Sequence, residues 1–112
     1  METLPKDTLM HIRPVWAEVD LDALAFTISS IRERAGKDRH VAAVVKANAY
    51  GHGAVEIIPT LLENGADFLC VALLDEALEI RKAGFTDVPI LILGYTEVQR
   101  AAELVKYDIQ QA

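Results

Sequence analysis

The stretch VVKANAYGHG, residues 44–53, decides the fold class of this 112-residue chain. Its first two residues close an apolar run, residues 41–45, that lacks alternation and is therefore typical of a strand buried on both faces of a parallel sheet. Lys46 follows that run, and Gly51 and Gly53 indicate a short loop before the next helical pattern. Side chains at the carboxyl ends of parallel strands build the active sites of α/β proteins. We therefore expect Lys46 to lie at a functional edge of the sheet.

The residues upstream of this stretch predict a helix. Asp20 stands where a helix N-cap is expected, Leu24 and Ile28 follow at helical spacing, and Gly36 marks the end. Before that helix, residues 15–19 alternate as a strand does.

Downstream, the same cycle of helix and strand repeats twice. Residues 53–64 read as a helix ended by Gly65, although Pro59 removes a backbone donor and is expected to kink or restart it. A buried strand at residues 68–72 precedes a helix with Asp75 as its candidate cap and Gly84 as its end.

The third cycle begins with Pro89 and a strand at residues 90–93. Thr96 and Gln99 have the spacing of a capping box and predict the next helix. Residues 107–111 then begin another strand. The apolar face of the helix is expected to consist of Val98, Ala101, Ala102 and Val105.

Strands that alternate with helices of this length predict an α/β fold made of βαβ units around a parallel sheet. The pattern alone fits either a barrel or an open doubly wound sheet. A complete (β/α)8 barrel needs about 250 residues, so a barrel reading makes this chain less than half of one.

Composition excludes several classes of function. The formal net charge of −6 gives no cationic surface for a phosphate backbone, so nucleic acid is a poor partner. Cys70 has no cysteine partner and is expected to be a buried thiol. No secretory signal or stretch of transmembrane length is present in the sequence, which favours a cytoplasmic protein without a membrane partner.

The residue types of the central stretch allow a Schiff base at Lys46 and anion binding in the loop that follows it. A partly buried lysine favours its neutral, nucleophilic amine and can form a Schiff base. Gly51 and Gly53 allow a close backbone approach, and a helix N-terminus beyond them favours an anion such as phosphate. The alternative interpretation is that Lys46 is only a solvated charge at a strand end and that the glycines form an ordinary turn.

The complete string resembles the cofactor-lysine signature of the alanine racemases, which depend on pyridoxal 5'-phosphate. The supporting segments WAEVDLDAL (16–24), DEALEIRKAG (75–84) and PILILG (89–94) occur in the order of that family. Related barrels such as the basic amino-acid decarboxylases share a shorter form of the lysine motif, without the extension at residues 50–53.

The resemblance implies a partial (β/α)8 TIM-type barrel of fold type III that contains only the N-terminal βα units. Residues 19–112 would form this incomplete cofactor-binding barrel. Residues 1–18 would form an N-terminal segment whose strand, residues 15–18, leaves the barrel and pairs with the family's C-terminal β domain, which lies outside this chain.

The resemblance also implies roles for single residues. Lys46 would form the internal aldimine and act as the base on one face of the substrate. Tyr50 would hydrogen-bond the cofactor phosphate, and Leu93 would pack near the cofactor ring unless it is ordinary strand core. His52 reads as a turn histidine that supports the loop, and Asn48 would order the same rim. No metal is implied.

The implied reaction interconverts L-alanine and D-alanine by two-base proton transfer, with D-alanine feeding peptidoglycan synthesis. In the family the second base is a tyrosine from the other subunit of a homodimer, supplied by its C-terminal domain. This chain alone would then be inactive. A non-catalytic cofactor-binding or assembly fragment is a second hypothesis, and an unrelated phosphate-binding module, in which Lys46 only neutralises charge, is a third.

Overall fold

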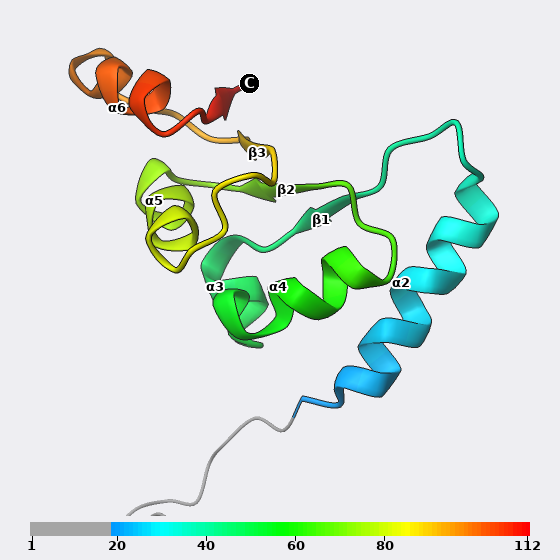
Figure 1. Ribbon diagram of the computed structural model, residues 1–112. Helices are drawn as coiled ribbons and strands as arrows, with labels where there is room; N and C mark the ends of the chain where they lie inside the picture. Colours follow the sequence, from blue (N-terminus) through cyan, green and yellow to red (C-terminus); the bar gives the residue numbers. More distant parts are fainter. Residues whose placement is uncertain (1–18) are drawn as a thin grey trace, which may run out of the picture.

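The computed structural model describes residues 19–112, so the predicted strand at residues 15–18 lies outside the described residues. The elements run in the order α2 (Leu21–Ala35), β1 (Ala42–Val44), α3 (Lys46–Tyr50), α4 (Ala54–Glu63), β2 (Phe68–Val71), α5 (Leu74–Lys82), β3 (Ile90–Ile92), the 3-10 helix η1 (Val98–Arg100), α6 (Ala101–Lys106) and β4 (Gln110–Gln111) (Figure 1). Helices and strands therefore alternate as the sequence predicts.

The strand order identifies the sheet as part of a barrel. The four described strands are all parallel, and each pairs with its neighbour in sequence, in the order β1-β2-β3-β4. An open doubly wound sheet reverses its order at a switch point, whereas a barrel adds every strand beside the previous one. The topology therefore decides for the partial (β/α)8 barrel, which the sequence pattern alone left open.

The two faces of the sheet differ in what covers them. On the face that packs against the helices, Leu69 pairs with Ile90, and both are fully buried. On the other face Val44, Cys70 and Leu91 form a row, in which Val44 is 40% exposed. This second face is the one that lines the interior of a closed barrel. Cys70 is buried as expected, and that burial raises the pKa of its thiol.

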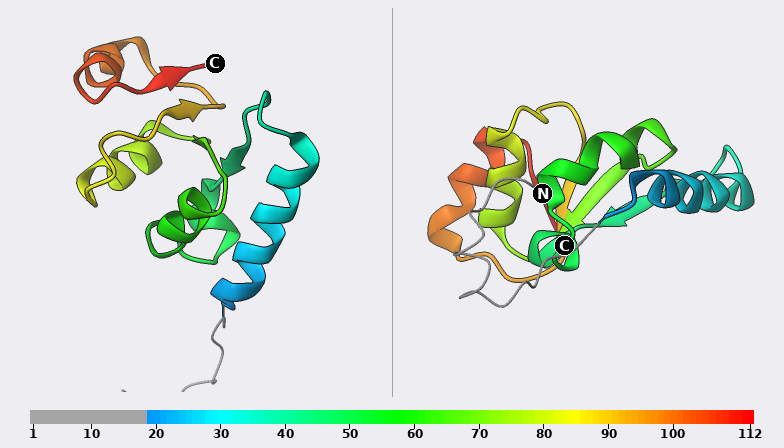
Figure 2. Two further views of the ribbon diagram at one scale, coloured as in Figure 1. Left: turned by 45° about the vertical axis from the view of Figure 1, so that its right-hand side comes forward. Right: turned by 90° about the horizontal axis from the view of Figure 1, so that it is seen from below.

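Helix α2 begins at the cap that the sequence predicts. One Asp20 carboxylate oxygen accepts hydrogen bonds from the backbone N–H groups of Asp22 (3.0 Å) and Ala23 (3.1 Å). The helix packs on α4 and ends at Gly36, whose φ is 83°. Helices α2 and α6 lie at opposite edges of the sheet (Figure 2). No helix within residues 19–112 has the length and hydropathy needed to cross a bilayer.

Two details of the middle helices differ from the sequence predictions. Helix α4 runs without a break through Pro59, because an apolar face that includes Ile58 and Leu61 is buried and outweighs the loss of one hydrogen bond at an exposed proline. Asp75 does not cap α5. The N-cap is Leu73, and the side chain of Glu76, three residues further on, accepts a hydrogen bond from the backbone N–H of Leu73.

The last helix also differs from its prediction. Thr96 donates its hydroxyl proton to Gln111 of β4 instead of capping a helix, and the chain forms η1 before α6. The predicted apolar face is solvent-exposed, with Val98 at 82% and Val105 at 83% exposure. Leu104 packs against the core in its place, because η1 shifts the helical phase.

Arg32 joins the entrances of β1 and β2. Near the end of α2 it donates to the carbonyls of Gly36 (3.0 Å), Arg39 (2.6 Å) and Gly65 (2.8 Å). It also forms an ion pair with Asp67, which precedes β2. The segment before β1 and the segment before β2 are therefore fixed to one guanidinium group.

Arg81, near the end of α5, repeats this arrangement for β3 and β4. It is the one charged residue in the buried core of the described chain, at 6% exposure. Its guanidinium donates to the carbonyls of Phe85 (2.9 Å), Val88 (2.6 Å), Tyr107 (2.9 Å) and Asp108 (2.8 Å). Burial lowers the pKa of this guanidinium. Both arginines thus bind the carbonyls four and seven residues further along the chain, and then the segment before the following strand.

Asp67 predicts a dependence of stability on pH. Its carboxylate accepts a hydrogen bond from the backbone N–H of Val41 (2.7 Å), and this bond and the Arg32 pair lower its pKa. A carboxyl with a lowered pKa stabilises the fold above its unfolded pKa of about 3.9, and the contribution is lost as pH falls through the folded value. Asp67→Asn should therefore lower the free energy of unfolding at pH 7. Below about pH 4 the difference from the unchanged protein should become smaller.

Urea unfolding of full-length protein at several pH values measures this effect. The matched control is Asp38→Asn, which changes an exposed carboxylate in the loop before β1. An equal loss of unfolding free energy in Asp67→Asn at pH 7 and below about pH 4 would contradict the stabilising role of the ionised Asp67 carboxylate.

Candidate active site

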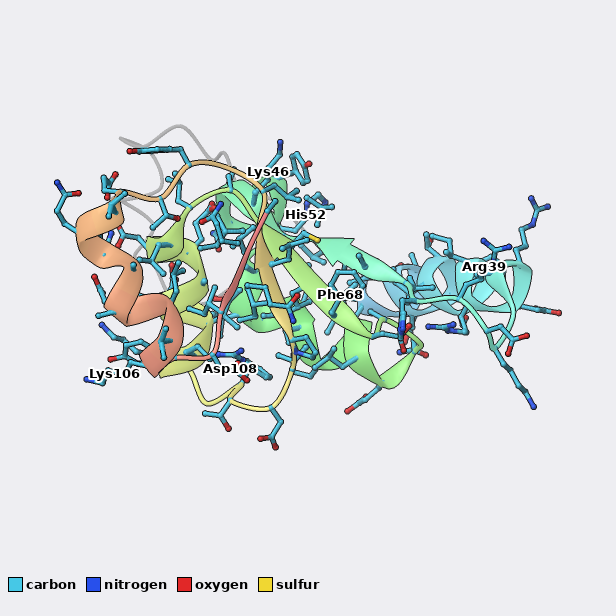
Figure 3. The ribbon with its side chains drawn as sticks, turned by 90° about the horizontal axis from the view of Figure 1, so that it is seen from above. Arg39, Lys46, His52, Phe68, Lys106 and Asp108 are labelled. Carbon is cyan, nitrogen blue, oxygen red and sulfur yellow. The ribbon has the colours of Figure 1, made fainter. Side chains whose placement is uncertain are left out.

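Lys46 lies at the carboxyl edge of the sheet, separated from β1 by Val45 alone, and its side chain is half-buried. Leu93 follows β3 at the same edge, where its backbone N–H donates to the carbonyl of Val71 (2.7 Å). Figure 3 shows Lys46 beside His52 at one edge of the molecule, while Asp108 lies at the opposite edge. The structure thus places the predicted lysine where barrels carry their chemistry.

The chain leaves Lys46 in a left-handed turn. The four residues from Ala47 to Tyr50 have φ values between 51° and 57°, although none is glycine. Such a conformation costs roughly 1–2 kcal/mol for each L-residue. Consecutive left-handed residues therefore persist only where the surrounding contacts hold them.

Several contacts hold the far side of this turn. Ala49 is buried and its N–H donates to the carbonyl of Val45 (2.9 Å). The side-chain oxygen of Asn48 accepts from the N–H of Ala54 (2.9 Å), at the start of α4. The His52 ring nitrogen Nδ1 lies 2.8 Å from the carbonyl of Ala49 and so must carry the proton. His52 and Asn48 therefore order the loop, as the sequence predicts.

The turn brings Lys46 and Tyr50 together. The Lys46 Nζ lies 5.9 Å from the centre of the Tyr50 ring, within cation–π range. The tyrosine is 61% exposed, so both groups are open to a ligand at this edge. An amine and a phenol hydroxyl are consequently available side by side.

Glu76 belongs to this edge, and sequence reasoning missed it. One of its carboxylate oxygens accepts from the N–H of Ala72 (2.8 Å) and of Leu73 (2.9 Å). The other accepts from the N–H of Ala47 (2.6 Å), the residue after Lys46. A glutamate three residues after a helix N-cap is a capping signal, but a leucine at the N-cap conceals it.

Gly94 keeps the loops after β2 and β3 in close contact. A Cβ atom at this position would lie 2.4 Å from the carbonyl oxygen of Ala72. Only glycine allows this close approach of the two loops. Leu93 itself is 49% exposed.

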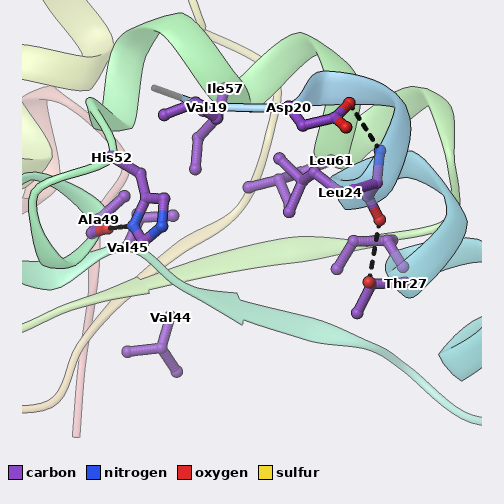
Figure 4. Close-up of a pocket in the computed structure, with 12 residues that line it drawn as sticks. Val19, Asp20, Leu24, Thr27, Val44, Val45, Ala49, His52, Ile57 and Leu61 are labelled. Atoms are coloured by element: carbon purple, nitrogen blue, oxygen red, sulfur yellow. Dashed lines mark hydrogen bonds between the residues drawn. The ribbon is translucent and has the colours of Figure 1, made fainter. Parts of the chain in front are cut away.

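A separate hollow of about 420 Å³ opens between α2, β1 and α4 (Figure 4). Apolar side chains such as Leu24, Val45 and Ile57 line it, and His52 borders it. Neither Lys46 nor Tyr50 contributes to its lining. Residues 19–112 contain no group of three or more His, Cys, Asp or Glu side chains placed to hold a metal ion.

Comparison with known proteins places the chain in one family. The family model described as "Alanine racemase, N-terminal domain" matches residues 19–112. Alanine racemase 1 of Clostridium acetobutylicum is 54% identical over 101 residues, which are 90% of this chain and 26% of that protein.

Solved structures agree with this match. The alanine racemase from Bacillus anthracis with bound L-Ala-P superposes with a TM-score of 0.84 at 42% identity, over 90% of this chain and 26% of that one. The alanine racemase from Bartonella henselae with covalently bound pyridoxal phosphate gives a TM-score of 0.75 at 28% identity, over 83% of this chain and 27% of that one.

The chain spans about a quarter of the length of these relatives. Within that span the parallel barrel segment, the lysine at the end of β1 and the sequence all agree. This agreement excludes an unrelated phosphate-binding module, and the chain belongs to the alanine racemase family.

Proposed function

We propose that this chain supplies the cofactor lysine of a pyridoxal-phosphate-dependent alanine racemase, an isomerase that interconverts L-alanine and D-alanine. The observation that carries the proposal is the position of Lys46, which leaves β1 in a left-handed turn and lies beside Tyr50. The same lysine lies within residues 19–112, which the family model matches.

The residues at this edge fit the cofactor. Lys46 offers a half-buried primary amine to an aldehyde, and Tyr50 offers an exposed hydroxyl to a phosphate oxygen. Leu93 presents a half-exposed apolar side chain for the ring. When bound, pyridoxal phosphate supplies a conjugated ring that spreads the negative charge left at the substrate Cα after a proton is removed.

In the proposed reaction Lys46 Nζ anchors the cofactor and exchanges a proton with Cα on one face of the substrate. Inversion requires a second base on the opposite face. We propose that this base is a tyrosine from the C-terminal domain of the other subunit of a homodimer. Residues 1–112 alone are then inactive, and the D-alanine formed by the full-length enzyme serves peptidoglycan synthesis. The cytoplasmic location stays a prediction.

The direct test is formation of D-alanine from L-alanine by the full-length protein with added pyridoxal phosphate. Racemisation supports the proposal. Cofactor binding at Lys46 without racemisation would favour the non-catalytic cofactor-binding role instead.

Tyr50→Phe in the full-length enzyme tests the phosphate contact. The change removes one hydrogen bond to a charged group, worth roughly 1.5–3 kcal/mol, so cofactor affinity should fall about 10- to 100-fold. Excess pyridoxal phosphate should restore most of the activity. The measurement is racemisation as a function of added cofactor.

The control is Tyr107→Phe, which removes a hydroxyl from the residue after α6, close to Asp108 at the opposite edge. Its cofactor dependence should match that of the unchanged enzyme. A Tyr50→Phe enzyme that needs no additional cofactor would remove Tyr50 from the phosphate site.

A further inference from the structure

We infer that Glu76 is a positioning residue for Lys46, because its carboxylate holds the near side of the left-handed turn on which the lysine stands. This inference rests on the function proposed for Lys46. It assigns a role to a side chain that makes no contact with the cofactor in the proposed scheme and acts only through the backbone of Ala47.

One carboxylate joins two loops at this edge. Its Oε1 accepts from the N–H groups of Ala72 and Leu73, 2.8 and 2.9 Å away, and so fixes Glu76 to the loop after β2. Its Oε2 accepts from the N–H of Ala47 at 2.6 Å. That nitrogen belongs to the peptide that joins Lys46 to Ala47, so the anchored atom is two bonds from the Cα of Lys46.

The turn needs an anchor at this end. Ala47 is the first of the four non-glycine residues with positive φ. The far end is held by Asn48, through Ala54, and by the buried Ala49, through Val45. Among the described side chains, only that of Glu76 bonds the backbone at the start of the turn. Without it, only backbone bonds hold Ala47, from the Gly51 N–H to the Ala47 carbonyl (3.2 Å) and from Ala49 to Val45 across it. They act against the right-handed and extended conformations that L-residues prefer.

A carboxylate is the group that this position requires. It accepts all three N–H bonds through two oxygens and strengthens them by its charge. A glutamine at this position has one acceptor oxygen, and its amide group would face a donor. Glu76→Gln should therefore keep part of the cap on α5 and lose the bond to Ala47.

The first experiment measures hydrogen exchange in cofactor-free, full-length protein by mass spectrometry. In Glu76→Gln the peptide that covers residues 44–53 should exchange about tenfold faster, the change expected for one charge-assisted bond. The matched control is Glu79→Gln, an exposed glutamate on the same helix, which should exchange as the unchanged protein does.

The second experiment measures the rate at which pyridoxal phosphate is captured at Lys46, by borohydride reduction followed by peptide mapping. Glu76→Gln should slow capture about tenfold relative to Glu79→Gln, as the lysine loses its fixed position. Adding Ala47→Gly should restore capture but not the protection from exchange, because glycine adopts positive φ without steric cost yet does not replace the lost hydrogen bond. A general weakening of α5 would not respond to that change.

If Glu76→Gln does not fold, Glu76→Asp replaces it, since aspartate keeps the charge near Leu73 but is one methylene too short to span to Ala47. Equal exchange and capture in the Glu76 variant and the Glu79→Gln control overturn the inference. Absence of capture by the unchanged protein overturns the proposed function instead. In that case, faster hydrogen exchange in the Glu76 variant would still support the conclusion that the Glu76 carboxylate stabilises the turn.

Discussion

Lys46→Ala in the full-length enzyme is expected to lower racemisation by more than the ~10²- to 10⁴-fold that follows the loss of one general base. The larger loss has a simple reason, since the same side chain anchors the cofactor covalently and serves as one of the two bases in the proposed reaction. Added pyridoxal phosphate should restore almost none of the activity. Racemisation measured against added cofactor tests this expectation.

The Lys46 and Tyr50 variants should therefore differ in kind. Tyr50→Phe should bind the cofactor more weakly and regain its racemisation activity with excess cofactor. Lys46→Ala should lose both racemisation and the absorbance of pyridoxal phosphate bound to the lysine. Lys106→Ala is the matched control, because Lys106 is an exposed lysine at the end of α6. Restoration of activity in Lys46→Ala by added cofactor alone would contradict the role of Lys46 as cofactor anchor and base.

The second large effect is expected in stability. Arg81→Met keeps an apolar stem of similar length but leaves the carbonyls of Phe85, Val88, Tyr107 and Asp108 without their donor. A buried acceptor left unpaired costs about 1–3 kcal/mol, which applies to the Val88 carbonyl, and the three part-buried carbonyls cost less each, so a loss of about 3–5 kcal/mol is expected. Urea unfolding of the full-length protein measures it.

Arg34→Met is the control for this change, since Arg34 is an exposed arginine in the last turn of α2, outside the buried core. Arg81→Lys should be nearly as damaging, because one ammonium cannot reach all four carbonyls in the two loops. A loss below about 1 kcal/mol in Arg81→Met would show that water replaces the guanidinium there.

The sequence predicted the barrel segment well wherever local signals agree with packing. Asp20 both caps α2 and precedes its apolar positions, and the apolar strand runs coincide with β1, β2 and β3. The choice between a barrel and an open sheet needed strand order, which is a long-range property. The position of Lys46 followed from the strand end, but its chemistry came from the family resemblance.

The errors have a common physical origin in tertiary contacts. Four left-handed residues without glycine have no local signature, because contacts from Glu76 and the buried Ala49 hold them in place. Asp75 looked like the cap of α5, yet it pairs with Arg100 (2.9 Å). The phase of α6 changed for the same reason, since Thr96 finds its partner in β4.

The two arginines divide the described barrel segment into pairs. Arg32 ties the entrance of β1 to that of β2, and Arg81 ties the entrance of β3 to that of β4. When one strand of a pair opens, the guanidinium and the carbonyls that it binds lose their hydrogen bonds. Opening a single βα unit therefore costs nearly as much free energy as opening both. Local opening of this protein should consequently involve both strands of a pair together.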